Sequence, residues 1–433
     1  MILRDPVHGL VAFEGRAERV VQTLLDTREV QRLRRVRQLG LASLVFPGAE
    51  HSRFSHALGA AHVMERLQRR VAVIERDLPP HDRLDDEAAA DALAAALLHD
   101  LGHGPFSHMF EEVLPRARHH EDWTRQLIED PATEVHRALE ALDRGMADRV
   151  ADLLRGDYRL PYLARSVSGT LDVDRADYLL RDSHMTGVRY GLYDLDWVLQ
   201  ALCFAEVGGQ WVLAVEGRKG LPPIESFFLG RHFMFQQVYH HKATRAAEAI
   251  VRAIFVRVRE LVQAGSPPES TPVALRKAAL GEPISLGEYF SLDDATLITS
   301  LSRWEQATDP WLAEFAQALN ARRLPKTVPL PERAPERWPE IYARASEVVA
   351  DRGGRADLRV WLDEPDDVPY QEPDDDSPKG LWVAIRHHPV QRLGDASFLL
   401  GEFRNKRIVR PRLIFPESSR GAVLDAIESL IAL

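Results

Sequence analysis

The chain has 433 residues, of which 45% are hydrophobic and 28% charged, and its formal net charge is −10. This is the balance of a soluble globular protein with room for two or three domains, and the negative charge argues against a general nucleic-acid binder. Cys203 is the only cysteine, which excludes a disulfide within the chain and suits the reducing cytoplasm. The sequence shows neither a secretory segment nor an apolar run that could span a bilayer, so we expect a cytoplasmic protein without a membrane partner.

The first residues, 2–13, contain a Pro and a Gly and predict a short strand hairpin. Beyond them, apolar residues recur at helical spacing through most of the chain. A second hairpin is predicted where two apolar runs, 202–206 and 210–216, flank a glycine turn at Gly208 and Gly209. The helices expected from the spacing cover residues 20–39, 55–73, 87–98, 122–129, 134–154, 174–183, 224–261 and 304–319.

The pattern predicts a mostly α-helical fold with small β-hairpins and a small C-terminal α+β lobe. We expect a catalytic core over residues 1–265, a helical extension over 266–353 and the lobe over 354–433. Within the lobe, residues 381–385 and 407–415 read as strands around a short helix, and 421–433 as a closing helix. Residues 363–376 hold eight acidic side chains and three prolines, which predicts a mobile, solvated loop.

The segment 97–108, Leu-Leu-His-Asp-Leu-Gly-His-Gly-Pro-Phe-Ser-His, follows an Ala/Leu-rich helix and begins with an adjacent His-Asp pair. A buried carboxylate beside a buried imidazole is costly unless a metal neutralises it. A His-Asp dipeptide by itself is also explained by a histidine at the end of a helix followed by a capping aspartate. The full order along the chain is more specific and gives four candidate metal ligands, His56, His99, Asp100 and Asp174. Imidazole with carboxylate suits Mn²⁺, Fe²⁺, Zn²⁺, Co²⁺ or Ni²⁺, with Mg²⁺ as a further option.

Further polar residues surround this pair and are candidates for acid–base chemistry. His103 and His108 flank a Gly-Pro turn, and Glu111 lies three residues after His108, where it could orient that imidazole. His120 is a fourth candidate, whereas we interpret His119 as a surface residue. The alternative for each histidine is an ordinary hydrogen-bonded or exposed side chain.

A third group of residues predicts a substrate-facing surface. Asp174, Tyr178 and Asp182 are spaced at i, i+4 and i+8, so they share one helix face as a ligand carboxylate, a phenol and a free carboxylate. Arginine forks suit phosphate oxygens, and the candidates are Arg53, Arg175 and Arg231. Tyr239 lies eight residues after Arg231 and can share its face, although core packing explains this tyrosine equally well.

The contexts of the candidate ligands resemble the HD-domain phosphohydrolases. They read Arg-Phe-Ser-His, Leu-Leu-His-Asp-Leu-Gly-His-Gly-Pro-Phe-Ser-His and Asp-Val-Asp-Arg-Ala-Asp-Tyr. The likeness is greatest to the bacterial and mammalian deoxynucleoside triphosphate triphosphohydrolases, and it covers roughly residues 2–247. It implies hydrolysis of a deoxynucleoside triphosphate to deoxynucleoside and inorganic triphosphate with a divalent metal.

The resemblance also implies roles for single residues. His108 with Glu111 would protonate the leaving 5′-oxygen, while His103 and His120 would face phosphate. Gln38 would join Tyr178 and Asp182 at the sugar 3′-hydroxyl, and Leu39 and Tyr239 would crowd the 2′ position and select deoxyribose. The phosphates would bind Arg53, Arg175 and Arg231.

A regulatory GTP or deoxynucleotide activator and a homo-oligomer, dimer or tetramer, are further implications of the resemblance. The corresponding positions are Asp26, Gln31, Arg34, Val45, Phe46, His241 and Lys242. Met1 and Gln237 stand where the family carries a Lys and an Arg, which departs from its pattern. Asp26 and Arg34 alternatively form a plain surface pair.

Two other functions stay open on the sequence alone. One is an HD phosphohydrolase that acts on a nucleoside monophosphate, a signalling nucleotide or single-stranded nucleic acid. The other is a nucleotide sensor or scaffold with a vestigial site. The complete set of candidate ligands favours an enzyme, and the sugar-facing residues favour a deoxynucleotide substrate.

Overall fold

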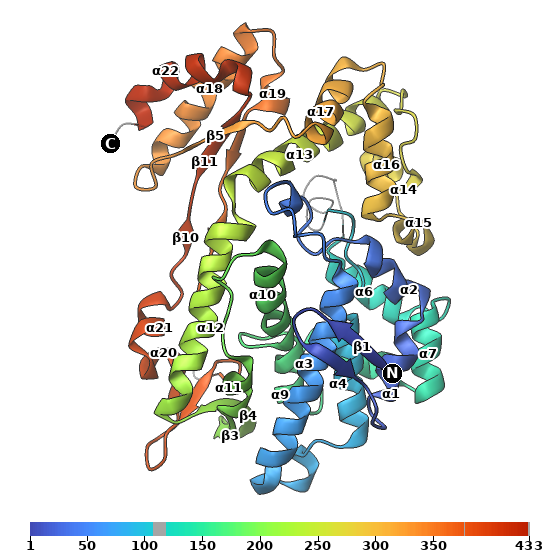
Figure 1. The fold of residues 1–433 in the computed structure, drawn as a ribbon, viewed down its shortest axis with the longest axis vertical. Helices are drawn as coiled ribbons and strands as arrows, with labels where there is room; N and C mark the ends of the chain where they lie inside the picture. Colours follow the sequence, from blue (N-terminus) through green and yellow to red (C-terminus); the bar gives the residue numbers. More distant parts are fainter. Residues whose placement is uncertain (107–117, 376, 432–433) are drawn as a thin grey trace.

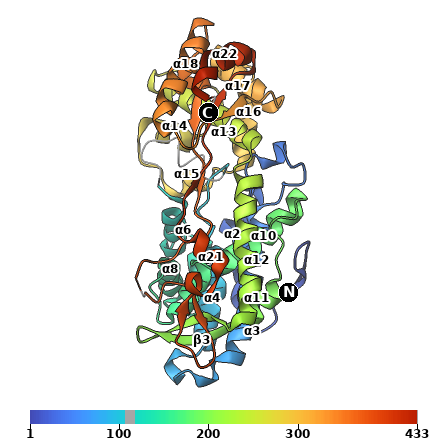
Figure 2. The same cartoon turned by 90° about the vertical axis from the view of Figure 1, so that its left-hand side faces the viewer.

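The computed structural model describes residues 1–106, 118–375 and 377–431 and shows an elongated, mostly helical molecule (Figure 1). The predicted fold class is confirmed. The helices of the first half surround α3 and α4, the long α12–α13 pair runs from there towards the other end of the molecule, and a small lobe with the C-terminus lies at that end (Figures 1 and 2). No helix in the described part of the chain is long and apolar enough to cross a membrane.

The helices of the first half are α1 (Arg19–Leu25), α2 (Arg28–Arg32), α3 (Arg53–Ile74), α4 (Asp86–Leu98), α6 (His120–Glu129), α7 (Glu134–Leu142), α8 (Met146–Arg155), α9 (Pro161–Val167), α10 (Val173–Thr186) and α11 (Leu195–Gln200). The middle of the chain forms α12 (Leu221–Met234), a π-helical turn (Phe235–Tyr239), α13 (Lys242–Gln263), α14 (Val273–Leu280), α15 (Leu286–Phe290), α16 (Asp294–Trp304) and α17 (Pro310–Asn320). The last helices are α18 (Trp338–Asp351), α19 (Ala356–Arg359), α20 (Leu393–Ala396), α21 (Phe398–Phe403) and α22 (Arg420–Ile431).

The strands in the described residues are short and form four small sheets. They are β1 (Ile2–Asp5), β2 (Gly9–Ala12), β3 (Leu202–Val207), β4 (Gln210–Glu216), β5 (Lys326–Pro329), β6 (Trp361–Asp363), β7 (Asp366–Asp367), β8 (Trp382–Ala384), β9 (Gln391–Arg392), β10 (Ile408–Val409) and β11 (Arg412–Phe415). The two predicted hairpins are confirmed as the antiparallel pairs β1–β2 and β3–β4. The other pairings join strands distant in sequence: β8 adds in parallel to β4, β11 lies between β5 and β6, and β7 pairs with β10.

Helix α4 lies at the centre of the core because its side chains are small and apolar. Asp85 caps its start by accepting the Ala88 N–H at 2.8 Å, and the alanines that follow are buried. Such a helix can be approached closely from several sides, and α1, α3 and α8 all pack against it. The helix therefore delivers His99, at its C-terminal end, into the middle of the molecule.

Several long helices predicted from spacing are interrupted in the structure. Residues 20–39 form α1, α2 and a 3₁₀ turn, with a break at Thr27, whose ψ is 143°. Residues 134–154 form two helices separated by Gly145 in the left-handed region, at a φ of 80°. Residues 224–261 divide at His241, and 304–319 at the capping Asp309. Apolar side chains keep facing the core across each break, so periodicity alone cannot reveal it.

The C-terminal part follows a different path from the one expected. The lobe is built from β5, α18, α19, β6, β11 and α22, so it begins before residue 354. Between β6 and β11 the chain leaves the lobe and packs against α12 and the β3–β4 hairpin, where Tyr370, Val383, Leu393 and Leu400 join a cluster with Phe227. The return to the lobe runs through β10 (Figure 1).

The prediction of a mobile, solvated loop over residues 363–376 is wrong for residues 363–372, whereas Asp374 and Asp375 are exposed. Asp363, Asp367 and Glu372 are buried and paired with arginines from other elements. Acidic composition predicts solvation only when cationic partners are absent, and here the partners come from distant parts of the sequence.

Arg32 connects the helical extension to the turn that follows α4. Its guanidinium is 1% exposed and donates to the carbonyls of His103 at 2.9 Å and of Phe290 and Leu292 at 3.1 Å. Arg32 therefore has a structural role. Removing the guanidinium would leave several buried carbonyl oxygens without a donor.

We expect Arg32→Met to lower the free energy of unfolding by about 3 kcal/mol, because buried carbonyls lose their donor. Urea unfolding followed by circular dichroism measures this. Arg28→Met is the matched control on the same helix, since its side chain is 59% exposed, and should change stability little. Equal effects of the two substitutions would contradict the structural role of Arg32.

Candidate metal centre

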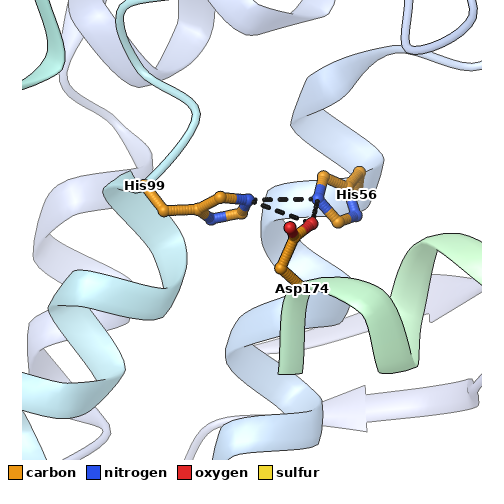
Figure 3. A group of neighbouring side chains, drawn as sticks. All are labelled: His56, His99 and Asp174. Carbon is orange, nitrogen blue, oxygen red and sulfur yellow. Dashed lines mark hydrogen bonds and ion pairs between the residues drawn. The ribbon is translucent and has the colours of Figure 1, made fainter. Parts of the chain in front are cut away.

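Three polar side chains from three helices meet at the centre of the core (Figure 3). His56 lies in the first turn of α3, His99 at the C-terminal end of α4 and Asp174 in the first turn of α10. The His56 Nε2 atom is 3.2 Å from His99 Nε2 and 3.0 Å from Asp174 Oδ1, and His99 Nε2 is 3.5 Å from the same oxygen. One imidazole nitrogen of each histidine and one carboxylate oxygen thus surround a common point.

Asp100, the fourth predicted ligand, borders this cluster. Its Oδ1 atom is 3.5 Å from His99 Nε2, and its Oδ2 atom is 3.8 Å from His56 Nε2. The carboxylate also pairs with Arg53 and, at 3.0 Å, with His103 Nε2. Asp100 therefore faces the cluster while two cationic or hydrogen-bonding partners hold it from the other side.

The two imidazoles are oriented by hydrogen bonds at their other nitrogens. His56 Nδ1 is 2.8 Å from Asp177 Oδ2, and His99 Nδ1 is 2.9 Å from the carbonyl oxygen of Ala96. When Nδ1 donates to an acceptor, the lone pair of Nε2 is available as a ligand. Both Nε2 atoms face the common point, so the donor set fits a divalent cation.

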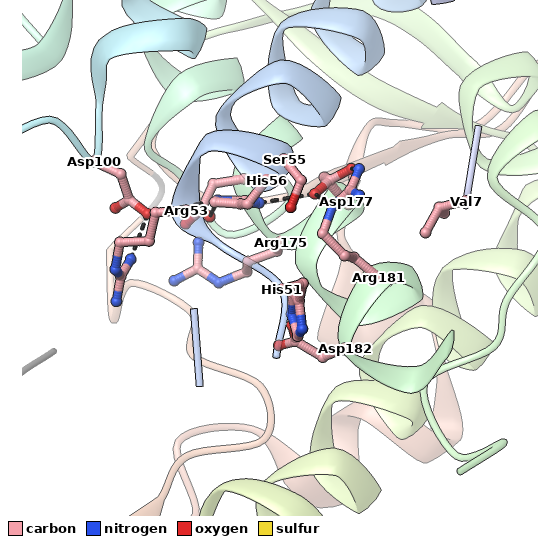
Figure 4. A network of polar contacts seen from close by, with 12 residues as sticks. Val7, His51, Arg53, Ser55, His56, Asp100, Arg175, Asp177, Arg181 and Asp182 are labelled. Carbon is pink, nitrogen blue, oxygen red and sulfur yellow. Dashed lines mark hydrogen bonds and ion pairs between the residues drawn. The ribbon is translucent and has the colours of Figure 1, made fainter. Parts of the chain in front are cut away.

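A buried ionic network lies behind His56 (Figure 4). Asp177 accepts from Arg181 at 2.8 Å through both of its oxygens and lies 2.7 Å from His8 Nε2. Arg181 in turn donates to Asp5 at 2.8 Å, so the β1–β2 hairpin is tied to α10. This network was not predicted from the sequence. A usable signal was present, because Asp177 lies one helical turn after Asp174.

The close approach of α3 and α10 depends on Gly59. A Cβ atom at this position would lie 1.9 Å from Asp177 Oδ1 and 2.3 Å from Arg181 Nη2. A larger residue would therefore displace the ion pair that supports His56. The glycine lies three residues after His56, on the same face of α3.

The electrostatics of the cluster are those of charges that are buried and mutually compensated. Burial alone would lower the pKa of His56, but the Asp174 and Asp177 carboxylates outweigh it and raise that pKa to about 10. Burial would raise the pKa of Asp174, but His56 and His99 hold it below its usual range. The carboxylates therefore stay ionised and face the imidazoles. In such a setting a cation can replace the protons on the imidazoles, because it compensates the same negative charges.

The turn after α4 places two further candidate residues together. The ring of His120 stacks on that of His103 with centroids 3.8 Å apart. Burial, with Arg53 nearby, holds the pKa of His103 well below its usual range, so this imidazole is neutral. His108 and Glu111 lie outside the described residues, and their predicted roles stay predictions.

Three of the predicted sugar-facing residues lie at the edge of the apolar cluster that contains Phe227. Leu39, Tyr178 and Tyr239 pack against it, and the two tyrosine rings are 6.1 Å apart. The ring of Tyr178 is 6.4 Å from that of His56, so this face adjoins the metal cluster. Tyr239 ends the π-helical turn, a local irregularity that proteins often use at functional positions.

Asp182 is not the free carboxylate that the spacing suggested. It is 1% exposed, and its two oxygens lie 2.7 Å from His51 Nε2 and 2.9 Å from the Tyr239 hydroxyl, which donates to it. His51 was missed because it lies in a loop without any motif. Gln38 lies next to it, since its N–H donates to the His51 carbonyl at 3.0 Å. Asp182 therefore fixes the positions of His51 and Tyr239.

Each of the three candidate phosphate-binding arginines is paired with a carboxylate. Arg53 contacts Asp100 (Figure 4), and Arg175 contacts Asp172, the N-cap of α10. Arg231 lies 3.0 Å from Asp367 of the C-terminal part. Burial raises the pKa of both Tyr178 and Tyr239, and the positive charge of Arg231 acts in the opposite direction on each.

The predicted regulatory residues fall into two local groups. Gln31 accepts from Arg34 at 2.8 Å, next to the exposed Asp26 at the end of α1. Phe46 contacts the ring of His241 at 5.6 Å, and Val45 precedes it in the chain. Lys242 lines a groove of about 1130 Å³ between α13, α17 and the C-terminal lobe, together with Arg322, Arg323, Lys326 and Arg420.

Comparison with known proteins agrees with this geometry. The HD domain family matches residues 53–182, which include all four predicted ligands. The Bacillus subtilis protein YwfO, itself uncharacterized, is 32% identical over 419 residues, covering 96% of this chain and 92% of its own length. The deoxynucleoside triphosphate triphosphohydrolase SAMHD1 of Danio rerio is 28% identical over 294 residues, covering 60% of this chain and 46% of its own length.

Solved structures show the same fold. The crystal structure of a phosphohydrolase from Bacteroides thetaiotaomicron superimposes with a TM-score of 0.79 at 26% identity, and the match covers 96% of this chain and all of the other. A hypothetical protein from Aquifex aeolicus matches with a TM-score of 0.71 over 99% of both chains. The chain spans about half the length of SAMHD1, so the likeness to that enzyme concerns its matched part.

Asp177 provides a direct test of the metal centre. We expect Asp177→Asn to weaken Mn²⁺ binding by about 10- to 100-fold, because the carboxylate orients His56 and raises its basicity. Isothermal titration calorimetry with Mn²⁺ alone measures the affinity. Asp91→Asn is the matched control. Asp91 is a buried carboxylate of α4 that lies away from the cluster and pairs with Arg149 at 2.7 Å. Unchanged Mn²⁺ affinity in a folded Asp177→Asn variant would contradict the assignment.

Proposed function

We propose that this chain, which belongs to the HD-domain family, is a metal-dependent phosphohydrolase. Its proposed reaction converts deoxynucleoside triphosphates to deoxynucleoside and inorganic triphosphate. The observation that carries the proposal is the adjacency of two surfaces. The His56–His99–Asp174 cluster fits a divalent cation, and the Tyr178 ring beside it belongs to the predicted sugar-facing group. A substrate with a phosphate and a sugar can contact both at once.

The reaction that we propose breaks the bond between the α-phosphorus and the 5′-oxygen. The oxygen of a water molecule bonds to the α-phosphorus, the 5′-oxygen leaves with its electron pair and takes up a proton, and the water loses one. A divalent cation held by His56, His99, Asp174 and Asp100 would supply Lewis-acid polarisation at the α-phosphate. His108, oriented by Glu111, would donate the proton to the leaving oxygen, as the family resemblance implies.

The chain's own residues would hold the triphosphate and position it for attack. Arg53, Arg175 and Arg231 are permanently charged, and their paired carboxylates limit how far the guanidinium groups can move. The stacked His103 and His120 lie beside the cluster and would hydrogen-bond to phosphate oxygens. Fixed donors of this kind lower the cost of organising the reacting groups.

The sugar would lie against Tyr178, with Gln38 and Asp182 at the 3′-hydroxyl side as the resemblance implies. Because both oxygens of Asp182 already have partners, we propose that it acts mainly by fixing Tyr239 and His51. Tyr239 and Leu39 would then close the space at the 2′ position. This arrangement would exclude ribonucleotides by shape.

We further propose that Val45, Phe46, His241 and Lys242 bind a regulatory nucleotide. The support is the contact between Phe46 and His241 and the basic groove that Lys242 lines. An aromatic contact surface beside several cationic side chains suits a base and its phosphates. Asp26, Gln31 and Arg34 would contribute from a second copy of the chain in a homo-oligomer.

Product analysis by chromatography tests the reaction. Purified protein is incubated with each of the four deoxynucleoside triphosphates and with GTP, singly and in pairs, in Mn²⁺ or Mg²⁺. We expect deoxynucleoside and intact triphosphate, with turnover that increases when a second nucleotide is present. Release of phosphate or pyrophosphate would mean that another bond is cut.

The double substitution His99→Ala with Asp100→Ala is the control for this experiment. It removes ligands of the cluster, and we expect it to abolish both Mn²⁺ binding and hydrolysis while the circular dichroism spectrum stays that of the folded protein. Full activity in this variant would contradict the assignment of the centre.

Tyr239 tests the sugar preference. We expect Tyr239→Ala to reduce the ratio of kcat/KM for dGTP to that for GTP by about tenfold, because the ring no longer blocks the 2′ position. Steady-state kinetics with both nucleotides measures the ratio. Tyr239→Phe keeps the ring and should keep most of the preference. An unchanged ratio in Tyr239→Ala would show that another residue excludes the 2′-hydroxyl.

A further inference from the structure

The segment 363–372, named here the strap, connects the C-terminal lobe to the side of α12 (Figures 1 and 2). It is held along its length by the returning chain. Strand β7 pairs with β10, the Pro365 carbonyl accepts the Arg410 N–H at 3.0 Å, and the Tyr370 carbonyl accepts the Asn405 N–H at 2.9 Å. The strap is therefore a fixed element of the fold.

The strap is also fastened to α12 by its side chains. Tyr370 is 1% exposed, and its ring lies 5.0 Å from that of Phe228. Its hydroxyl donates to Glu372 at 2.7 Å, and Glu372 pairs with Arg404 at 2.9 Å. These contacts fix the positions of the residues between Asp363 and Tyr370.

At this place the strap contacts Arg231 of α12 through one ion pair and two hydrogen bonds to backbone carbonyls. The Arg231 Nη1 atom is 3.0 Å from Asp367 Oδ1, 2.9 Å from the Val368 carbonyl oxygen and 3.2 Å from that of Pro369. The guanidinium also lies over the Phe235 ring, 4.4 Å from its centroid. All these contacts with described strap residues use Nη1, which leaves Nε and Nη2 as donors for another anion.

The carboxylate of Asp367 is buried in this contact with Arg231. Its side chain is 5% exposed, and its second oxygen lies 3.5 Å from His232 Nδ1. A buried carboxylate is costly unless a cation compensates it, so Asp367 and Arg231 hold each other in place. The other two candidate phosphate-binding arginines have the same kind of partner, but from nearby in the site: Asp100 and Asp172.

We infer that Asp367 is a positioning residue that, with the Val368 and Pro369 carbonyls, aims Arg231 at the triphosphate of the substrate, so that the C-terminal segment completes the active site. This inference rests on the proposed function. A free arginine side chain loses considerable conformational entropy when it binds a phosphate. A guanidinium that is already held at one edge loses less, so the substrate binds more tightly.

Steady-state kinetics of Asp367→Asn with a deoxynucleoside triphosphate tests the inference. We expect KM to rise about tenfold while kcat changes much less, because the contact of Arg231 with the triphosphate exists in both the bound substrate and the transition state. Asp367→Glu keeps the charge but moves it by one methylene, and its KM should lie between those of the wild type and the asparagine variant. It also serves as the test variant if Asp367→Asn does not fold.

A double-substitution cycle distinguishes positioning from a general loss of structure. In an Arg231→Ala background, Asp367→Asn should cause no further rise in KM, because its effect passes through the missing guanidinium. Glu372→Gln is the matched control: it removes a buried strap carboxylate that pairs with Arg404 instead. It should lower thermal stability without raising KM.

Three results would overturn the inference: an unchanged KM in Asp367→Asn, an equal rise in Glu372→Gln, or additive effects of Asp367→Asn and Arg231→Ala. If the wild type hydrolyses no deoxynucleoside triphosphate, the proposed function fails, and binding of inorganic tripolyphosphate then tests the inference separately. Weaker binding by Asp367→Asn than by Glu372→Gln would support it, and equal affinity would overturn it.

Discussion

The contact on which the rest of the site depends is the one between Asp177 and its three partners. A buried carboxylate requires compensation, and Asp177 obtains it from Arg181 on its own helix, His8 of the N-terminal hairpin and His56 of α3. These pairings fix the approach of α3 to α10 and the rotamer of His56. They also explain why a glycine faces this point and why the hairpin packs where it does.

The same principle organises the anion-facing side of the site. Without carboxylate partners, the three arginines Arg53, Arg175 and Arg231 would repel one another. Their long, permanently charged side chains would also adopt many conformations. Each has a carboxylate that offsets part of its charge and limits its movement. Under the proposed function, a trianionic or tetra-anionic substrate would then meet several oriented donors, and the carboxylates would balance the arginine charges in its absence.

Candidate site residues that lie in short motifs or at regular helical spacing could be predicted from the sequence. His56, His99 and Asp174 could be recognised because each sits in a short motif, and the structure brings them to one point. Tyr178 followed from helical spacing. His51 and Asp367 could not be found in this way: each meets its partner, Asp182 or Arg231, across more than a hundred residues, and no motif surrounds it. The acidic segment was misjudged for the same reason, because composition does not show where its arginine partners lie.

The match to the HD domain family ends at residue 182, before Arg231, Tyr239 and the strap. The matched region contains the metal cluster and Tyr178, whereas the surfaces that would hold the distal phosphates and close the 2′ side come from α12, the π-helical turn and the C-terminal segment. Family membership therefore accounts for the metal-binding cluster, and under the proposed function the rest of the chain would contribute to the choice of substrate. The strap contacts α12 from a position more than a hundred residues away, so a chain that ended at residue 265 would lack the partner of Arg231. Under the proposed function, the C-terminal part would therefore contribute to the active site as well as to the fold.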